Sequence, residues 1–337
     1  MSLATVLILL AVLVVSVALL LVVVAAVWWI DRYDREPLHL VAFVFLWGAS
    51  IAPVASVMAF GAVSRVLGGA VSAGSIDTIT SLFLAPFVEE IAKAAGVLLI
   101  VLLTNKFDNP TDGVVYGTAV GLGFAATENL YYAFGAIAEF RGVNGILILV
   151  GGRTLLVAGI HALSSATFGG FLGYAVLSPK KAVRLGWATA GLALAIGLHA
   201  AWNTALLYVG PFSPDGTVRG WLWFLPSLYV VYLIILTAFL HSEKRILKRE
   251  LAEEVELKLA PAWVVDVIPY YRRRVRSTWW PSRPERTVIA RLLTRVAFRK
   301  HALRRLPSEE SAVPSLELVM LRQRVREILG PRPSSKP

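Results

Sequence analysis

Long apolar runs separated by short polar loops make up the first 240 residues of the chain. A helix that crosses a bilayer needs about 20 mainly apolar residues, so each such run predicts one membrane span. The predicted spans are residues 3–30, 38–66, 77–104, 112–137, 144–177, 185–209 and 219–241. The predicted fold class is therefore all-α: a polytopic membrane helix bundle of about seven transmembrane helices, with eight as the alternative count.

Two of these runs need separate comment. The first, residues 3–30, has no basic leader and is too long for the core of a signal peptide, so we expect a retained transmembrane helix. The fifth, residues 144–177, is long enough to be tilted in the membrane or broken near residues 151–153.

The loops between the spans predict an orientation, because short cytoplasmic loops retain Lys and Arg. With seven spans, the basic loops at residues 31–37, 104–110 and 178–184 fall on the same side as the C-terminal tail. The loops at 67–76 and 210–218 then face the other side and hold almost no basic residues. We therefore expect a cytoplasmic C-terminus and an external N-terminus, an arrangement that an eighth span would break.

The composition changes near residue 242, where charged helical stretches separated by proline replace the apolar runs. Residues 241–337 hold 22 of the 33 Lys and Arg but 11 of the 22 Asp and Glu, so the whole formal net charge of +11 lies there. The predicted domains are a membrane domain over residues 1–241 and a basic cytoplasmic tail with amphipathic helices over residues 242–337.

One stretch of the tail has an apolar stripe flanked by arginines. Such a stripe is typical of a helix that lies on an anionic membrane surface. Its residues are Val288, Ile289, Leu292, Leu293 and Val296. We therefore expect the lipid bilayer, and anionic lipid in particular, as the partner of the tail. Nucleic acid is not the expected partner, since a basic tail tethered beside anionic lipid needs none.

The overall composition agrees with a membrane protein and limits the chemistry. The chain is 57% hydrophobic and 16% charged, with a mean hydropathy of +0.67. It has no cysteine, which excludes disulfides, thiolate catalysis and cysteine-ligated zinc. Any metal must be held by His, Asp or Glu.

Ionisable residues nevertheless recur in four successive spans, where each costs about 2.5–3.5 kcal/mol at a helix centre. Counting from the predicted ends of each span places them in one layer, at or just outside the bilayer centre. They are Glu89, Glu90 and Lys93 in the third span, Glu128 in the fourth, Arg153 and His161 in the fifth, and His199 with Asn203 in the sixth. Such residues usually face the bundle interior and serve a function.

Helical spacing predicts some of their relations. Glu89 and Lys93 are four residues apart and share a face, so we expect an ion pair between them that leaves Glu90 as the freer carboxylate. His199 and Asn203 have the same spacing, which lets the amide orient the imidazole or a shared ligand. Glu128 continues a strip of glycines, and His161 begins a row of small residues, so both are expected at seams where two helices pack closely.

Two classes of function would use these groups. In peptide hydrolysis, a desolvated glutamate activates water while His and Asn stabilise the oxyanion, with or without zinc. Glu with two His also makes a catalytic zinc set, although the helical HExxH motif is absent. In transport, buried Glu and His form proton relays. A receptor or scaffold would leave the three acids unexplained.

The chain resembles the PrsW family of bacterial intramembrane proteases, which are similar to the CAAX prenyl proteases of the larger CPBP group. The resemblance covers about 170 residues and leaves the tail without a counterpart. It rests on DRYDREP (31–37), FVEEIAKAAGV (87–97), DGVVYGTAVGLGFAATENLYYA (112–133), HALSSATFGGFLGYA (161–175) and LHAAWN (198–203).

The resemblance implies a catalytic set, with glutamates that activate water and His and Asn that stabilise the oxyanion. The set is Glu89, Glu90, Glu128, His161, His199 and Asn203. Glu128 stands where the prenyl proteases carry His. The cofactor is left open between zinc and no metal, with Glu90, Glu128, His161 and His199 as candidate ligands. The implied substrate is a single-span anti-sigma factor, cut near its external end in a site-1 cleavage at the bacterial plasma membrane.

Overall fold

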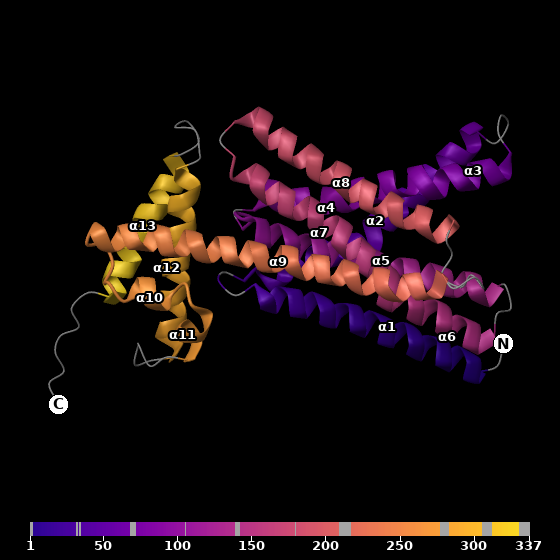
Figure 1. Cartoon of the computed structure of the whole chain (residues 1–337), viewed down its shortest axis with the longest axis horizontal. Helices are drawn as coiled ribbons and strands as arrows, with labels where there is room; N and C mark the ends of the chain where they lie inside the picture. The colour runs from indigo at the N-terminus through magenta and orange to yellow at the C-terminus, as the bar shows by residue number, and fades with distance from the viewer. Residues whose placement is uncertain are drawn as a thin grey trace.

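The structure is a computed structural model. It describes residues 3–31, 33, 35–67, 72–104, 106–138, 142–178, 180–208, 217–276, 283–304 and 312–329. Within these ranges the regular elements are helices (Figure 1). In chain order they are α1 (Leu3–Ile30), α2 (Leu38–Leu67), α3 (Ala73–Ile79), the π-helical turn η1 (Thr80–Leu84), α4 (Ala85–Leu103), α5 (Pro110–Ala138), α6 (Gly142–Gly152), the π-helical turn η2 (Arg153–Val157), α7 (Ala158–Val176), α8 (Lys181–Tyr208), α9 (Thr217–Glu256), α10 (Val264–Val267), α11 (Tyr271–Arg276), α12 (Arg283–Leu303) and α13 (Ala312–Leu329).

The helices confirm an all-α membrane protein. Each of the seven predicted spans is covered by a helical segment. These segments are helices α1, α2, α5, α8 and α9 and the continuous segments α3–η1–α4 and α6–η2–α7. Four helical segments of the described chain are long and apolar enough by themselves to cross a membrane: Val6–Ile30, Leu38–Val66, Gly142–Val176 and Lys181–Leu207. The chain is thus a multi-pass membrane protein. The count of seven and the cytoplasmic side of the tail stay predictions.

Helix α5 lies at the centre of the bundle and packs against α7, α2 and α1. Its contact with α7 is close because glycine replaces side chains along the seam. A Cβ atom added at Gly117 would lie 2.2 Å from the carbonyl oxygen of Ser165, and one at Gly121 would lie 2.3 Å from that of His161. The glycine strip of α5 and the row of small residues on α7 were each predicted to lie at a close helix seam. The structure shows that they pack against each other, which places His161 beside α5.

Helix α9 continues without interruption from the bundle into the tail (Figure 1). The composition boundary predicted at residue 242 therefore lies inside a helix. Helices α10, α12 and α13 pack near the end of α9 around a core that includes Leu247 and Leu251 of α9 and Leu293 of α12. Tyr33, from the loop between α1 and α2, also enters this core, and its hydroxyl donates to the carbonyl of Pro269 at 2.9 Å.

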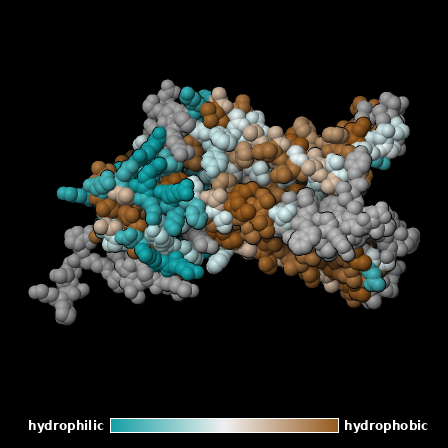
Figure 2. All heavy atoms as spheres, in the orientation of Figure 1, coloured by the Kyte–Doolittle hydropathy of each residue, from teal (hydrophilic) through white to brown (hydrophobic). Residues whose placement is uncertain are grey.

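The apolar stripe on α12 packs into protein. Ile289, Leu293 and Val296 are at most 2% exposed in the core of the tail, and only Val288 is well exposed. The prediction that this stripe faces a membrane is wrong, because the pattern of a surface-bound helix is also that of a helix buried on one side. Binding of anionic lipid to the tail stays a prediction that rests on charge alone. Figure 2 shows hydrophilic side chains gathered on the tail and hydrophobic ones along the bundle.

Ion pairs also hold the tail helices on α9. The Glu254 carboxylate accepts from Arg322 at 2.6 Å and lies 2.9 Å from the Lys300 ammonium. Burial by itself would raise the pKa of Glu254, but hydrogen bonds and charge from Arg322 and Lys300 outweigh it and lower that pKa below its usual value. The tail is thus a packed helical unit around the end of α9.

The glycine seam between α5 and α7 can be tested by Gly117→Val. The added side chain meets backbone rather than a flexible neighbour, so we expect a loss of about 1–3 kcal/mol in the free energy of unfolding and a lower melting temperature in detergent. The matched control is Gly186→Val on α8, where a Cβ meets nothing within 4 Å. Equal melting temperatures for the two variants would contradict this close packing.

Candidate active site

Helix α4 carries three ionisable side chains into the bundle. Glu89 is 7% exposed, Glu90 1% and Lys93 0%. Lys93 therefore needs partners inside the protein, since a bare ammonium in an apolar interior is very costly. It lies 2.5 Å from Oε1 of Glu90, 3.2 Å from Nδ1 of His161 and 4.5 Å from the centre of the Phe124 ring.

The predicted ion pair between Glu89 and Lys93 is wrong, because the lysine binds Glu90. Residues three and four positions apart on a helix are both neighbours, and the contacts of Lys93 with α5 and α7 decide between them. Glu90 is fully engaged: its Oε1 also lies 2.9 Å from Nδ1 of His199, and its Oε2 accepts from Ser165 at 3.3 Å.

Glu89 is therefore the freer of the two glutamates. Its Oε2 is buried and has no hydrogen-bond partner among the described residues. This atom lies 3.8 Å from Nε2 of His199. Because the Glu90 carboxylate can only accept, Nδ1 of His199 donates to it, and Nε2 is the ring nitrogen that lies toward Glu89.

On the other side of the site, the Glu128 carboxylate contacts the His161 imidazole and the Arg153 guanidinium. Nε2 of His161 lies 2.7 Å from its Oε2, and Nη2 of Arg153 lies 2.8 Å from the same oxygen. The Arg153 guanidinium also lies 3.6 Å from the centre of the Tyr132 ring. Since the Lys93 ammonium only donates, it faces a lone pair on Nδ1 of His161, and Nε2 donates to Glu128.

Arg153 is a site residue that spacing alone did not single out. It begins the π-helical turn η2, which is anchored by its next residue: Thr154 bonds Ser16 of α1 at 2.6 Å and Asn129 of α5 at 3.1 Å. π-Helical turns are frequent at functional sites. An arginine in an apolar run was one signal. The break predicted near residues 151–153 coincides with the start of η2, although the pattern did not specify a π-helical turn.

Asn203 does not orient the His199 imidazole, which was one of the two roles its spacing allowed; the other, orienting a shared ligand, stays a prediction. Its Nδ2 donates to the carbonyl oxygen of Ser81, in the other π-helical turn, at 2.9 Å. The His199 imidazole is instead held by Glu90. Asn203 therefore joins α8 to η1, and its side chain borders the cavity described next.

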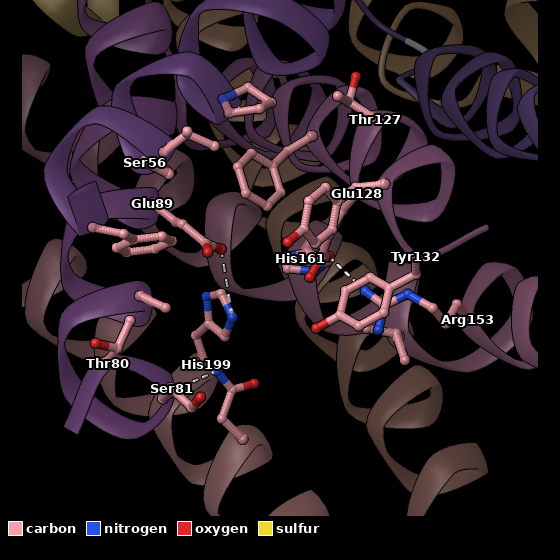
Figure 3. Close-up of a pocket in the computed structure, with 18 of the residues that line it drawn as sticks. Ser56, Thr80, Ser81, Glu89, Thr127, Glu128, Tyr132, Arg153, His161 and His199 are labelled. Atoms are coloured by element: carbon pink, nitrogen blue, oxygen red, sulfur yellow. Dashed lines mark hydrogen bonds and ion pairs between the residues drawn. The ribbon is translucent and has the colours of Figure 1, made fainter. Parts of the chain in front are cut away.

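A cavity of about 760 Å³ connects these groups. Figure 3 shows Glu89 and His199 on one side of it, and His161, Glu128 and Arg153 on the other. Among the predicted catalytic residues, those that line it are Glu89, Glu128, His161, His199 and Asn203. Glu90 lies behind them and contacts His199. Four helices thus converge carboxylates and imidazoles on one cavity.

The donor atoms fit a metal ion. One oxygen of Glu89 and one nitrogen each of His161 and His199 all lie within 4.8 Å of one another. Two imidazoles and a carboxylate are a known catalytic zinc set. The contact between Glu90 and Nδ1 of His199 is the carboxylate–histidine pair that orients such ligands. Of the four candidate ligands implied by the resemblance, His161 and His199 are in this set, and Glu89 takes the place of Glu90.

Comparisons with known proteins agree on one family. Residues 36–239 match the family described as PrsW family intramembrane metalloprotease. Protease PrsW of Bacillus subtilis (strain 168) is 32% identical over 177 residues, which are 52% of this chain and 73% of the relative. Protease PrsW of Geobacillus kaustophilus (strain HTA426) is 32% identical over 178 residues, covering 52% and 71%. That of Clostridioides difficile (strain 630) is 27% identical over 186 residues, covering 54% and 74%. No solved structure matches the chain significantly.

The role of Lys93 can be tested by Lys93→Met. Removing the ammonium leaves the buried Glu90 carboxylate without its main partner, so we expect the free energy of unfolding to fall by about 3–5 kcal/mol. Thermal melting in detergent measures this, with Lys106→Met, at an exposed position, as the control. The double variant Lys93→Met/Glu90→Gln should regain part of the loss. If Lys93→Met melts like the wild type, Lys93 does not neutralise Glu90.

Proposed function

We propose that this chain, which belongs to the PrsW family of intramembrane metalloproteases, hydrolyses a peptide bond of a membrane-anchored substrate with water activated by Glu89. The observation that carries the proposal is the buried Oε2 of Glu89, which has no hydrogen-bond partner among the described residues and lies at the edge of a cavity. Family membership makes the chain an intramembrane peptidase. It thereby favours hydrolysis over proton-coupled transport, the other function suggested by buried Glu and His.

Glu89 acts as the proton acceptor in this proposal. A water molecule beside Oε2 would lose a proton to it while attacking the carbonyl carbon of the scissile bond, and the same proton would then pass to the leaving amine. Glu90 takes no proton, because Lys93, His199 and Ser165 engage its oxygens. Its role is to hold His199 in place.

Donors for the developing oxyanion border the same cavity. Arg153 has a buried Nε without a hydrogen-bond partner among the described residues. Asn203 uses one amide hydrogen on Ser81 and keeps a second. Fixed donors are worth more in such a water-poor site than in solution. Arg153 and Asn203 are therefore proposed to bind the carbonyl oxygen of the scissile bond as it becomes negative.

The zinc set of Glu89, His161 and His199 is compatible with this role. A carboxylate has two oxygens, so Glu89 can serve an ion with one and a water proton with the other. When bound, zinc would supply Lewis-acid activation of water. His199 is held for such a task by Glu90. His161 contacts Glu128 through Nε2 and Lys93 through Nδ1, so it would have to give up one of these contacts to bind the ion.

The proposed substrate is a single-span protein, such as an anti-sigma factor, cut near its external end at the bacterial plasma membrane. The position of the site supports this. Glu128 lies ten residues before the end of α5 and His199 nine before the end of α8, at the ends that face away from the tail in Figure 1. If the basic loops and the tail are cytoplasmic, the cavity lies in the outer half of the membrane.

Glu89→Gln tests the proposed mechanism. The amide keeps the shape of the side chain but cannot accept the proton, so cleavage of a single-span substrate in liposomes should fall by about 10²–10⁴-fold. Glu256→Gln, at an exposed position on α9, serves as the control. Undiminished cleavage by Glu89→Gln, in protein that melts like the wild type, would remove Glu89 from the mechanism.

Metal content tests the donor set. We expect the purified wild-type chain to carry about one zinc ion per molecule, and His161→Ala/His199→Ala to carry none, because two of three ligands are lost. Elemental analysis measures the metal directly. Chelation should remove both zinc and cleavage, and added zinc should restore them. Full activity in protein stripped of metal would show that the site works without an ion.

A further inference from the structure

Helices α2 and α5 are in close contact along one part of their length. A Cβ added at Gly48 of α2 would lie 2.0 Å from the carbonyl oxygen of Val120, and one at Gly123 of α5 would lie 2.0 Å from that of Phe45. The hydroxyl of Thr127 donates to the carbonyl of Ala49 at 2.5 Å. No side chain or substrate fits between the two backbones in this part.

Pro53 lies one helical turn beyond Ala49, the last residue of α2 in these contacts. A proline inside a helix lacks the N–H that would bond four residues back, and it bends the helix. Beyond it, a Cβ added at Gly61 of α2 would meet nothing within 4 Å. Val57 of α2 is 65% exposed and Tyr131 of α5 is 70% exposed, yet both line the cavity. The cavity therefore reaches the outer surface of the bundle between α2 and α5.

Contacts between described residues join the other helices that surround the cavity. Asn203 of α8 bonds η1 through Ser81. Glu128 of α5 pairs with Arg153 of η2. Trp202 of α8 is 3% exposed and packs against Ile160 of α7. In Figure 1, α3, which follows α2 in the chain, stands apart from α5 and α6.

We propose that the membrane-spanning segment of the substrate reaches the active site laterally, through the opening between α2 and α5 beyond Pro53. The inference rests on the proposed function and adds the route and the surface that binds the substrate. Val54, Val57 and Met58 present apolar side chains at the α2 wall of the opening, which suits a segment arriving from lipid.

The polar groups inside favour a peptide over a lipid chain as the occupant. A helix must unwind before a protease can attack it, and its freed N–H and C=O groups then need partners within the membrane. Thr80, Ser81, Thr127 and Asn203 line the cavity beside the catalytic groups and offer such partners. An acyl chain has no hydrogen-bonding groups to match them.

Cross-linking can test this route, because the chain has no cysteine of its own. Single cysteines are placed at Val57 or Tyr131 in the Glu89→Gln variant and labelled with a photoreactive maleimide in liposomes. The controls are Val14→Cys on α1 and Leu185→Cys on α8, which are 67% and 65% exposed and do not line the cavity. The substrate is one that the wild-type chain cleaves.

We expect substrate adducts at Val57→Cys and Tyr131→Cys to exceed those at the controls several-fold. Equal adducts at all four positions, or adducts with lipid alone at Val57→Cys and Tyr131→Cys, would overturn the lateral route and leave the proposed function standing. A wild-type chain that cleaves no membrane-anchored substrate would instead overturn both.

A second measurement closes the opening. In Val57→Cys/Tyr131→Cys with Glu89 intact, a bifunctional thiol reagent joins α2 to α5. Cleavage of the membrane-anchored substrate should fall at least tenfold, while a short water-soluble peptide with the same cleavage sequence is still cut. Undiminished cleavage after complete bridging contradicts the route. Loss of both activities also contradicts it, because the bridge would then act on the site and not on access.

Discussion

A lysine ammonium with no exposed surface is the constraint on which the membrane site depends. Lys93 can lie inside the bundle only if anionic and electron-rich groups surround it, and Glu90, His161 and Phe124 do so. Satisfying Lys93 commits Glu90, and Glu90 in turn fixes the His199 imidazole through Nδ1. What remains is Glu89, whose Oε2 faces His199 without a hydrogen bond. Neutralisation of Lys93 thus gives two adjacent glutamates different roles. Glu90 is structural, and Glu89 is available for chemistry.

Much of this arrangement could be predicted from the sequence because the membrane simplifies the problem. Apolar length alone located the seven long helical segments, and the cost of burying charge indicated that Glu128, His161 and His199 face inward. The depth that they share with Glu89, in four helices, indicated that they meet. The glycine strip of α5 indicated a close helix seam, since only a missing side chain lets two backbones touch, and the structure identified α7 as the partner.

The predictions that failed were those in which two different structures share the same sequence pattern. Spacings of three and four residues are equally near on a helix, so the partner of Lys93 depended on α5 and α7, which no local pattern describes. An amphipathic stripe is the same whether its apolar face meets lipid or protein, and on α12 it meets α9 and its neighbours. The sequence indicated a break near Arg153 but not its π-helical form, and it gave no sign of the π-helical turn that carries Ser81.

The unbroken course of α9 has a mechanical consequence. Its 40 residues make a rod of about 60 Å, roughly twice the thickness of the hydrocarbon layer. Within the bundle, the Tyr229 hydroxyl donates to the carbonyl of Leu155 in η2, two residues from Arg153. From Tyr229 to its end, α9 contains neither proline nor glycine, so this part forms a stiff shaft between the contact with η2 and the tail. A torque applied to the tail would be transmitted along that shaft to the turn that holds the arginine of the active site.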